Sequence, residues 1–127
     1  MSERRRVFSD SPYEARFGFC RAVRTGDRVL VAGTAPIWPD GSCDPDAGVQ
    51  ARRCFEIILA ALAELGAETR HVVRTRVYIT DASHNEAVGN AHGEVFAGSP
   101  PVNTMVVVAG LVDERWKVEI EAEAVLD

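Results

Sequence analysis

Two segments near the end of the chain have patterns typical of β-strands, and they constrain the fold more than any other feature. Residues 102–108, Val-Asn-Thr-Met-Val-Val-Val, are apolar on both faces, so we expect this strand to be buried on both faces. Residues 117–125 instead alternate without a break between apolar side chains and glutamates, which predicts a strand with one face on a core. The apolar positions are Val118, Ile120, Ala122 and Ala124, and the glutamates are Glu119, Glu121 and Glu123.

The middle of the chain predicts a hairpin followed by a helix. Residues 19–24 and 28–33 are two short apolar stretches separated by a glycine turn, as in a β-hairpin. Residues 47–65 then carry apolar side chains at the three- and four-residue spacing of one helix face. Asp46 is suited to cap the start of this helix, and Gly66 is suited to cap its end.

A second strand-and-helix unit follows. Residues 73–79 alternate as a strand, and a helix is predicted to begin at Asp81 or Ser83 and to end near Phe96. The expected order is therefore ββαβαββ, in one domain that spans residues 1–127. This is an α+β sheet with two helices on one face.

Composition and charge exclude several classes of function. The formal net charge of −5 argues against a nucleic-acid partner, because binding nucleic acid needs a basic surface. The run of arginines at positions 4–6 is interpreted as a solvated terminus. No apolar run reaches the 18 or so residues of a membrane span, and no signal peptide is evident, so we expect a cytoplasmic protein without a membrane partner. The three cysteines have no paired spacing and are expected to be reduced thiols.

Metal and cofactor sites are also not expected. His71, His84 and His92 lack the spacing of metal ligands, and the chain has no glycine-rich phosphate loop.

The second face of the sheet raises a burial problem. Two helices cover one face only, and an uncovered apolar sheet face of this size is unusual in a monomer, so we expect a symmetric oligomer.

The last third of the chain resembles the signature of the YjgF/RidA (Rid) family. The resemblance rests on the segment Pro101-Val102-Asn103-Thr104 and the apolar strand that it begins, followed by a turn and then by Val118-Glu119-Ile120. The resemblance covers nearly the whole chain. It implies a fold of the bacterial chorismate-mutase type, and a homotrimer with a cleft for a small molecule at each subunit interface. It also implies hydrolysis of enamines or imines, typically 2-imino acids, to 2-oxo acids and ammonia.

One position departs from that signature. Where the family's deaminases carry an arginine that holds the substrate carboxylate, this chain has Asn103. Asparagine cannot reproduce the planar, bidentate fork of arginine, and losing such a contact to an ionised group typically costs about 1.5–3 kcal/mol. We therefore expect an altered substrate range.

The remaining site residues are carried over from the resemblance one at a time. The glutamate of the last strand is Glu119, which the resemblance implies handles the attacking water, and the helix asparagine is Asn90. Two hydroxyls are missing, because the tyrosine position is Phe19 and the serine-glycine pair is Ala32-Gly33. Family members often carry a thiol two residues after the arginine, and this chain has Met105 there. The backbone of Thr104, between positions 103 and 105, remains available to a ligand.

Several alternatives remain open from sequence alone. Glu119 either acts on water or lines a salt-bridged face with Glu121 and Glu123. Arg74 and Arg76 either pair with those glutamates, which we favour, or supply the missing cation. The functional hypotheses are an enamine or imine deaminase of altered range, a non-catalytic binder of a small metabolite, and, least favoured, an RNA-cleaving enzyme.

Overall fold

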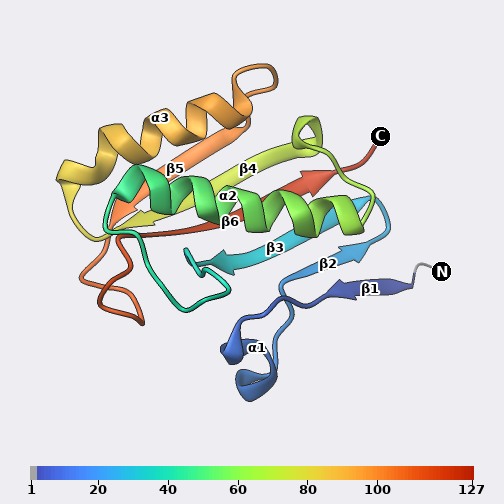
Figure 1. Cartoon of the computed structure of the whole chain (residues 1–127). Helices are drawn as coiled ribbons and strands as arrows, with labels where there is room; N and C mark the ends of the chain where they lie inside the picture. Colours follow the sequence, from blue (N-terminus) through green and yellow to red (C-terminus); the bar gives the residue numbers. More distant parts are fainter. Residues whose placement is uncertain (1–2) are drawn as a thin grey trace.

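A computed structural model describes residues 3–127, and across these residues the chain forms a six-stranded sheet in the order β1-β2-β3-β6-β4-β5, with helices α2 and α3 on one face (Figure 1). The expected α+β class is confirmed. The bounds are β1 Arg4–Val7, α1 Pro12–Phe17, β2 Ala22–Thr25, β3 Arg28–Thr34, α2 Ala47–Glu64, the 3₁₀ turn Thr69–His71, β4 Val72–Ile79, the 3₁₀ turn Ala82–His84, α3 Asn85–Phe96, β5 Val102–Val107 and β6 Val118–Val125.

The N-terminal strand and the short helix that follows it were not expected from the sequence. Arg4, Arg5 and Arg6 belong to β1, a strand that the sequence did not predict and that pairs antiparallel with β2. Their side chains are nevertheless exposed, because β1 is an edge strand. Ser11 caps α1 by accepting a hydrogen bond from the Tyr13 amide, and Gly18 ends the helix at a φ of 74°.

Helix α2 and strand β6 form the centre of the core. Asp46 caps α2 as predicted, with its Oδ1 accepting a hydrogen bond 2.9 Å long from the Val49 amide. Gly66 follows the last helical turn with a φ of 82°, a conformation that favours glycine. The apolar side of β6 is buried as its alternation predicted, against the buried residues Cys54, Phe55, Ile58 and Leu62 of α2.

Strand β5 differs from the expectation. It lies at the edge of the sheet and, among residues 3–127, pairs only with β4, in parallel, so the prediction that it is buried on both faces is wrong for the single chain. Met105 of this strand packs against the core, but Val102 is 58% exposed and Val107 is 56% exposed, because β5 lies at the edge of the sheet. These apolar side chains remain uncovered in the monomer.

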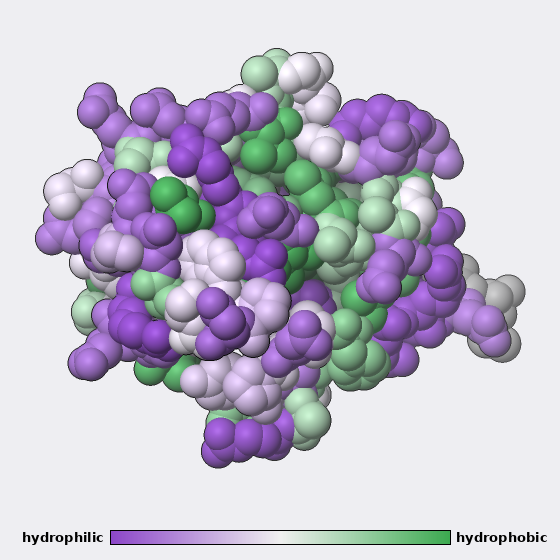
Figure 2. All heavy atoms as spheres, viewed as in Figure 1, coloured by the Kyte–Doolittle hydropathy of each residue, from purple (hydrophilic) through white to green (hydrophobic). Residues whose placement is uncertain are grey.

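The two faces of the molecule differ in how they are covered. The helix side presents a largely hydrophilic surface with small apolar patches (Figure 2). The opposite face of the sheet carries the half-exposed glutamates of β6 and the arginines of β4. Within residues 3–127, none of the helices is both long and apolar enough to cross a bilayer.

Candidate functional site

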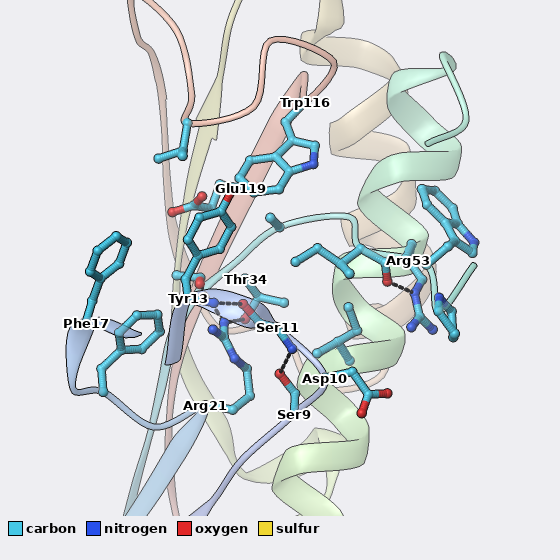
Figure 3. A pocket seen from close by; sticks show the side chains of 18 residues that line it. Ser9, Asp10, Ser11, Tyr13, Phe17, Arg21, Thr34, Arg53, Trp116 and Glu119 are labelled. Atoms are coloured by element: carbon cyan, nitrogen blue, oxygen red, sulfur yellow. Dashed lines mark hydrogen bonds between the residues drawn. The ribbon is translucent and has the colours of Figure 1, made fainter. Parts of the chain in front are cut away.

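A cavity of about 300 Å³ lies where the end of β3, the α1 region and the loop before β6 meet (Figure 3). Its volume is at the lower end of the range for small-molecule sites. The lining comes from the segment around α1, from the last residues of β3 and the loop after them, from α2, and from Glu119 of β6. Segments distant in the sequence therefore build one site.

Glu119 contributes the carboxylate of this cavity. It lies on the face of β6 opposite the core, and among residues 3–127 its carboxylate forms no hydrogen bond and no ion pair. Burial raises the pKa of the Glu119 carboxyl; nearby Arg21 opposes this effect, and Glu121 adds to it. A carboxyl group with a raised pKa and no partner is suited to exchange a proton with a bound molecule or a water.

Gly33 allows this position of Glu119. The register between β3 and β6 shifts between Val31 and Thr34, which places Gly33 against the glutamate side chain. A Cβ atom built on Gly33 would lie 2.6 Å from Oε2 of Glu119, closer than such atoms approach in proteins. Gly33 is therefore required for close approach, although its φ is not positive.

A buried ion pair supports one wall of the cavity. Arg21 Nε donates to Glu14 Oε2 over 3.1 Å, and both side chains are almost completely buried. Glu14 also accepts hydrogen bonds from the Ser9 amide, at 2.8 Å, and from the Ser9 hydroxyl. Burial raises the pKa of the Glu14 carboxyl, but the hydrogen bonds from Ser9 and the pairing with Arg21 outweigh burial and hold it below its usual value. The carboxylate is therefore ionised and balances the Arg21 charge.

The other end of Arg21 connects this pair to β3. Its Nη1 donates to the Gly33 carbonyl at 2.6 Å and to the Thr34 hydroxyl at 3.1 Å. The Nε and Nη1 donors of the guanidinium are thus engaged by the protein. The guanidinium fixes the α1 region against the strand that carries Gly33, and so orders the wall beside Glu119.

Aromatic side chains make up much of the remaining lining. The Tyr13 ring stacks beside Phe17 at 6.0 Å between centroids and meets Trp116 edge-on at 6.2 Å. Phe19 and Trp38 also line the cavity. Within the described part of the chain, the Tyr13 hydroxyl has no hydrogen-bond partner, so a ligand can use it.

A second arginine lines the cavity on the α2 side. Arg53 Nε donates to the Ile37 carbonyl at 2.7 Å, and its Nη1 lies 3.8 Å from Glu56 (Figure 3). Glu119 projects from β6 at the other end of the lining. The cavity therefore has an apolar middle, an unpartnered carboxylate on the sheet side and a partnered guanidinium on the helix side.

Only some of the candidate site residues lie together in the single chain. Glu119, Gly33 and Phe19 line the cavity. The others lie outside its lining: Ala32, Asn90, Asn103, Thr104, Met105 and Arg76. Asn90 and Thr104 are exposed, and Met105 packs against the core.

Asn103 belongs to a separate chain of polar contacts on the helix side of the sheet. Its Nδ2 donates to the Thr75 hydroxyl at 2.9 Å, and that hydroxyl lies 2.7 Å from Nε2 of His92. His92 packs against Phe55 and Phe96, and burial lowers the pKa of its ring. A neutral imidazole can accept the Thr75 proton, so the three residues form a satisfied relay.

Of the two arginines of β4, Arg76 pairs with glutamates of β6, which is the alternative we favoured. Arg76 Nη1 lies 3.3 Å from Glu121 and 3.6 Å from Glu123, and the Tyr78 hydroxyl donates to Glu121 at 2.9 Å. Arg74 lines the same shallow depression on this face. Neither arginine lines the cavity that contains Glu119.

Sequence reasoning missed most of the cavity lining, including Tyr13, Arg21 and Trp116. Tyr13 and Arg21 depend on α1, an element that was not expected because six residues give too little periodicity. Trp116 stands in the loop before β6, where no pattern marks it. An arginine inside the apolar stretch of residues 19–24 was the one available signal, because a buried arginine requires a partner.

Comparison with known proteins agrees with this geometry. The model of the Endoribonuclease L-PSP family matches residues 9–126. An uncharacterized protein of Streptomyces coelicolor is 45% identical over 123 residues, which cover 94% of this chain and 90% of the relative. The chain therefore belongs to the YjgF/RidA (Rid) family.

Two further relatives bear on structure and activity. The crystal structure of a Mycobacterium tuberculosis member of the YjgF/YER057c/UK114 family superposes with a TM-score of 0.90 at 40% identity, and the match covers 98% of this chain and 100% of that one. A 2-iminobutanoate/2-iminopropanoate deaminase of Salmonella typhimurium is 29% identical, with 84% of this chain and 86% of the relative covered.

Proposed function

We propose that this protein is a trimeric Rid-family deaminase that hydrolyses a reactive imine or enamine, with Glu119 as the residue that handles the water. The observation that carries the proposal is the Glu119 carboxyl, which lines the cavity with no partner in the described part of the chain and has its pKa raised by burial. The distant relatives named as deaminases support the reaction class. The trimer is supported by the uncovered apolar side chains of β5.

The reaction needs little beyond a positioned water and a proton carrier. The oxygen of water bonds to the carbon of the protonated imine, the carbon–nitrogen π electrons become the nitrogen lone pair, and the Glu119 carboxylate takes one proton of the water. Glu119 delivers this proton to the amino nitrogen of the resulting carbinolamine. The carbon–nitrogen bond then breaks while the hydroxyl returns its proton to the Glu119 carboxylate, so that a carbonyl compound and ammonia leave. A carboxyl whose pKa lies closer to neutrality than usual is efficient at these transfers.

The substrate range is proposed to differ from that of the named deaminases. Asn103 replaces the arginine that the family signature carries, and Arg76 is engaged by Glu121 and Glu123. Arg21 is likewise balanced by Glu14. A 2-imino acid would thus find no unpaired cation for its carboxylate among these residues.

The test compares imines with and without a carboxylate. An amino-acid oxidase acting on alanine supplies 2-iminopropanoate, and an amine oxidase acting on phenethylamine supplies an imine that lacks the carboxylate. Product formation is measured as the rate above spontaneous hydrolysis. We expect weak or no acceleration for 2-iminopropanoate and clear acceleration for the second imine, lost in Glu119→Gln and kept in Glu123→Gln.

A non-catalytic metabolite-binding protein is the second candidate. It is favoured by the loss of two hydroxyls at Phe19 and Ala32. Saturable binding of a ligand with no acceleration of either imine would select it. Cleavage of RNA is not proposed, because the chain carries a net charge of −5 and the cavity a free carboxylate, which repel phosphates.

A further inference from the structure

We propose that the cavity around Glu119 selects an organic cation: a protonated imine or amine that carries a flat apolar group and has no carboxylate beside its nitrogen. The inference rests on the proposed function, because it names the substrate class of the same cavity. It depends on three features of the lining, namely its net charge, its aromatic rings and its hydroxyl group.

The charge of the lining favours a cation. Arg21 is neutralised by Glu14 at 3.1 Å, and its Nη1 donates to the Gly33 carbonyl and the Thr34 hydroxyl. Arg53 is held by the Ile37 carbonyl and lies beside Glu56. Glu119 has no such partner among residues 3–127, so the charge left for a ligand is negative.

The aromatic rings favour the same kind of ligand. Tyr13, Phe17 and Trp116 form a continuous wall, with centroids 6.0 and 6.2 Å apart along it. Aromatic faces attract cations, and a wall of rings beside a carboxylate is the combination that recognises organic ammonium groups. The rings also give a flat apolar substituent a surface on which to stack.

Tyr13 supplies a hydroxyl to the cavity. Phe19 lacks that group, but Tyr13 lines the same cavity from α1, and its hydroxyl has no partner within the described residues. A hydroxyl group can accept from an N–H of a cation and donate to water at the same time. Its placement thus complements Glu119 without adding a positive charge.

A carboxylate next to the ligand nitrogen would be unfavourable here. With the nitrogen at Glu119, such a carboxylate would sit within a few atoms of another carboxylate, and the charge of the nearby Arg21 guanidinium is already paired with Glu14. Two like charges this close in a partly dry site repel each other. Cations without that group should therefore bind more tightly than the corresponding amino acids.

Four matched ligands test the proposal by isothermal titration calorimetry at neutral pH. Phenethylammonium is the cation, 2-phenylethanol replaces its charge with a hydroxyl, phenylalanine adds a carboxylate beside the nitrogen, and phenylacetate is the anion. We expect phenethylammonium to bind at least about tenfold more tightly than each of the other three, which is the usual value of a charge-assisted contact.

Variants identify the groups responsible. Glu119→Gln keeps the shape of the side chain and should remove the preference for the cation, whereas Glu123→Gln, on the same strand face but outside the cavity, should keep it. Tyr13→Phe should weaken phenethylammonium severalfold through the hydroxyl alone, and Tyr13→Leu further through the ring. Thermal unfolding of each variant checks that the fold is intact.

The outcomes separate this inference from the proposed function. Tightest binding of phenylacetate or phenylalanine, equal binding of the cation and the alcohol, or a cation preference that survives Glu119→Gln would each overturn it. If phenethylammonium is preferred but no imine is hydrolysed, the inference holds and the proposed catalysis fails. If imines are hydrolysed with no preference for cations, the catalysis holds and the inference fails.

Discussion

Gly33 and Glu119 face each other across neighbouring strands, so closely that a Cβ atom on Gly33 would lie 2.6 Å from Oε2 of Glu119. The contact arises at the register shift between β3 and β6. It means that the carboxylate of the cavity holds its position only because residue 33 has no side chain. The backbone at Gly33 also accepts a hydrogen bond from Arg21, which connects Glu119 to the N-terminal wall of the site.

Replacing Gly33 by alanine should displace the Glu119 carboxylate without unfolding the protein. The atom that the new methyl group would meet is the end of a flexible side chain, which can move aside. We expect ligand binding and imine hydrolysis to fall about tenfold or more, since misplacement by about 1 Å has large effects on catalysis. Calorimetry and the coupled oxidase assay measure the two losses.

Gly89→Ala is the matched control for this prediction. A Cβ atom at Gly89 meets nothing within 4 Å, and the residue lies inside α3. Alanine there should stabilise the helix by up to about 1 kcal/mol and leave the site unaffected. Wild-type binding in Gly33→Ala would show that Glu119 does not need its observed position.

Arg21 and Glu14 should be strongly coupled in stability. Arg21→Met leaves the buried Glu14 carboxylate without its cation, which we expect to cost about 3–5 kcal/mol in the free energy of unfolding. The double variant Glu14→Met/Arg21→Met should be less unstable than the sum of the two single changes, because neither uncompensated charge remains. Urea unfolding of the four proteins gives the coupling energy.

An exposed arginine provides the comparison. Arg28 lies 3.7 Å from Glu123, with its side chain 58% exposed, and Arg28→Met should change stability by no more than about 1 kcal/mol. Simple additivity at positions 14 and 21 would mean that the pair does not act as a unit.

The raised pKa of Glu119 predicts a pH dependence of stability. Burial raises this pKa above its ordinary value of 4.5, with Arg21 acting against the shift and Glu121 with it. Between 4.5 and the raised value, the folded protein binds more protons at this site than the unfolded chain does. The contribution of Glu119 to stability therefore decreases as pH rises through that window, and the decrease is complete above the folded-state pKa.

Glu119→Gln isolates this effect, because glutamine does not titrate. The free energy of unfolding of the wild type should fall relative to that of Glu119→Gln as the pH is raised from 4.5 toward neutrality. Urea titrations at several pH values measure it, and Glu123→Gln corrects for the general effect of removing one negative charge. A difference that is constant or that grows in favour of the wild type would argue against a buried, titrating Glu119.

The sequence predicted the fold wherever a long element repeated its pattern. The alternation of β6 and the helical spacing of α2 identified which side of each faces the core, because burial of one face leaves a regular trace in the residues. The apolar content of β5 was misleading, since its residues are apolar yet lie on an edge strand. Composition alone does not give a strand its position in the sheet.

The candidate site was only partly predictable. Glu119, Gly33 and Phe19 were named from sequence and line one cavity, whereas Tyr13 and Arg21 depend on a six-residue helix and a buried ion pair. Glu14 and Arg21 are seven residues apart in the sequence, and the residues between them have no repeating pattern from which the ion pair could be predicted. Asn103 was named as a binding residue, and in the single chain it lies on β5, away from the cavity.

Position 103 gives the most direct test of how the site is completed. Asn103 is exposed on the edge strand, and Thr75 keeps His92 as a partner if the asparagine is lost, so Asn103→Arg should fold normally. If a second copy of the chain brings β5 to the cavity, the new guanidinium should raise affinity for pyruvate and 2-oxobutanoate by about 1.5–3 kcal/mol, roughly ten- to hundredfold. Asn103→Gln, which lengthens the side chain without adding a charge, should not raise the affinity for either acid. Calorimetry measures affinity, and sedimentation checks for an assembly of three times the 13.8 kDa chain. A trimer in which Asn103→Arg folds but binds neither acid would place residue 103 outside the cleft.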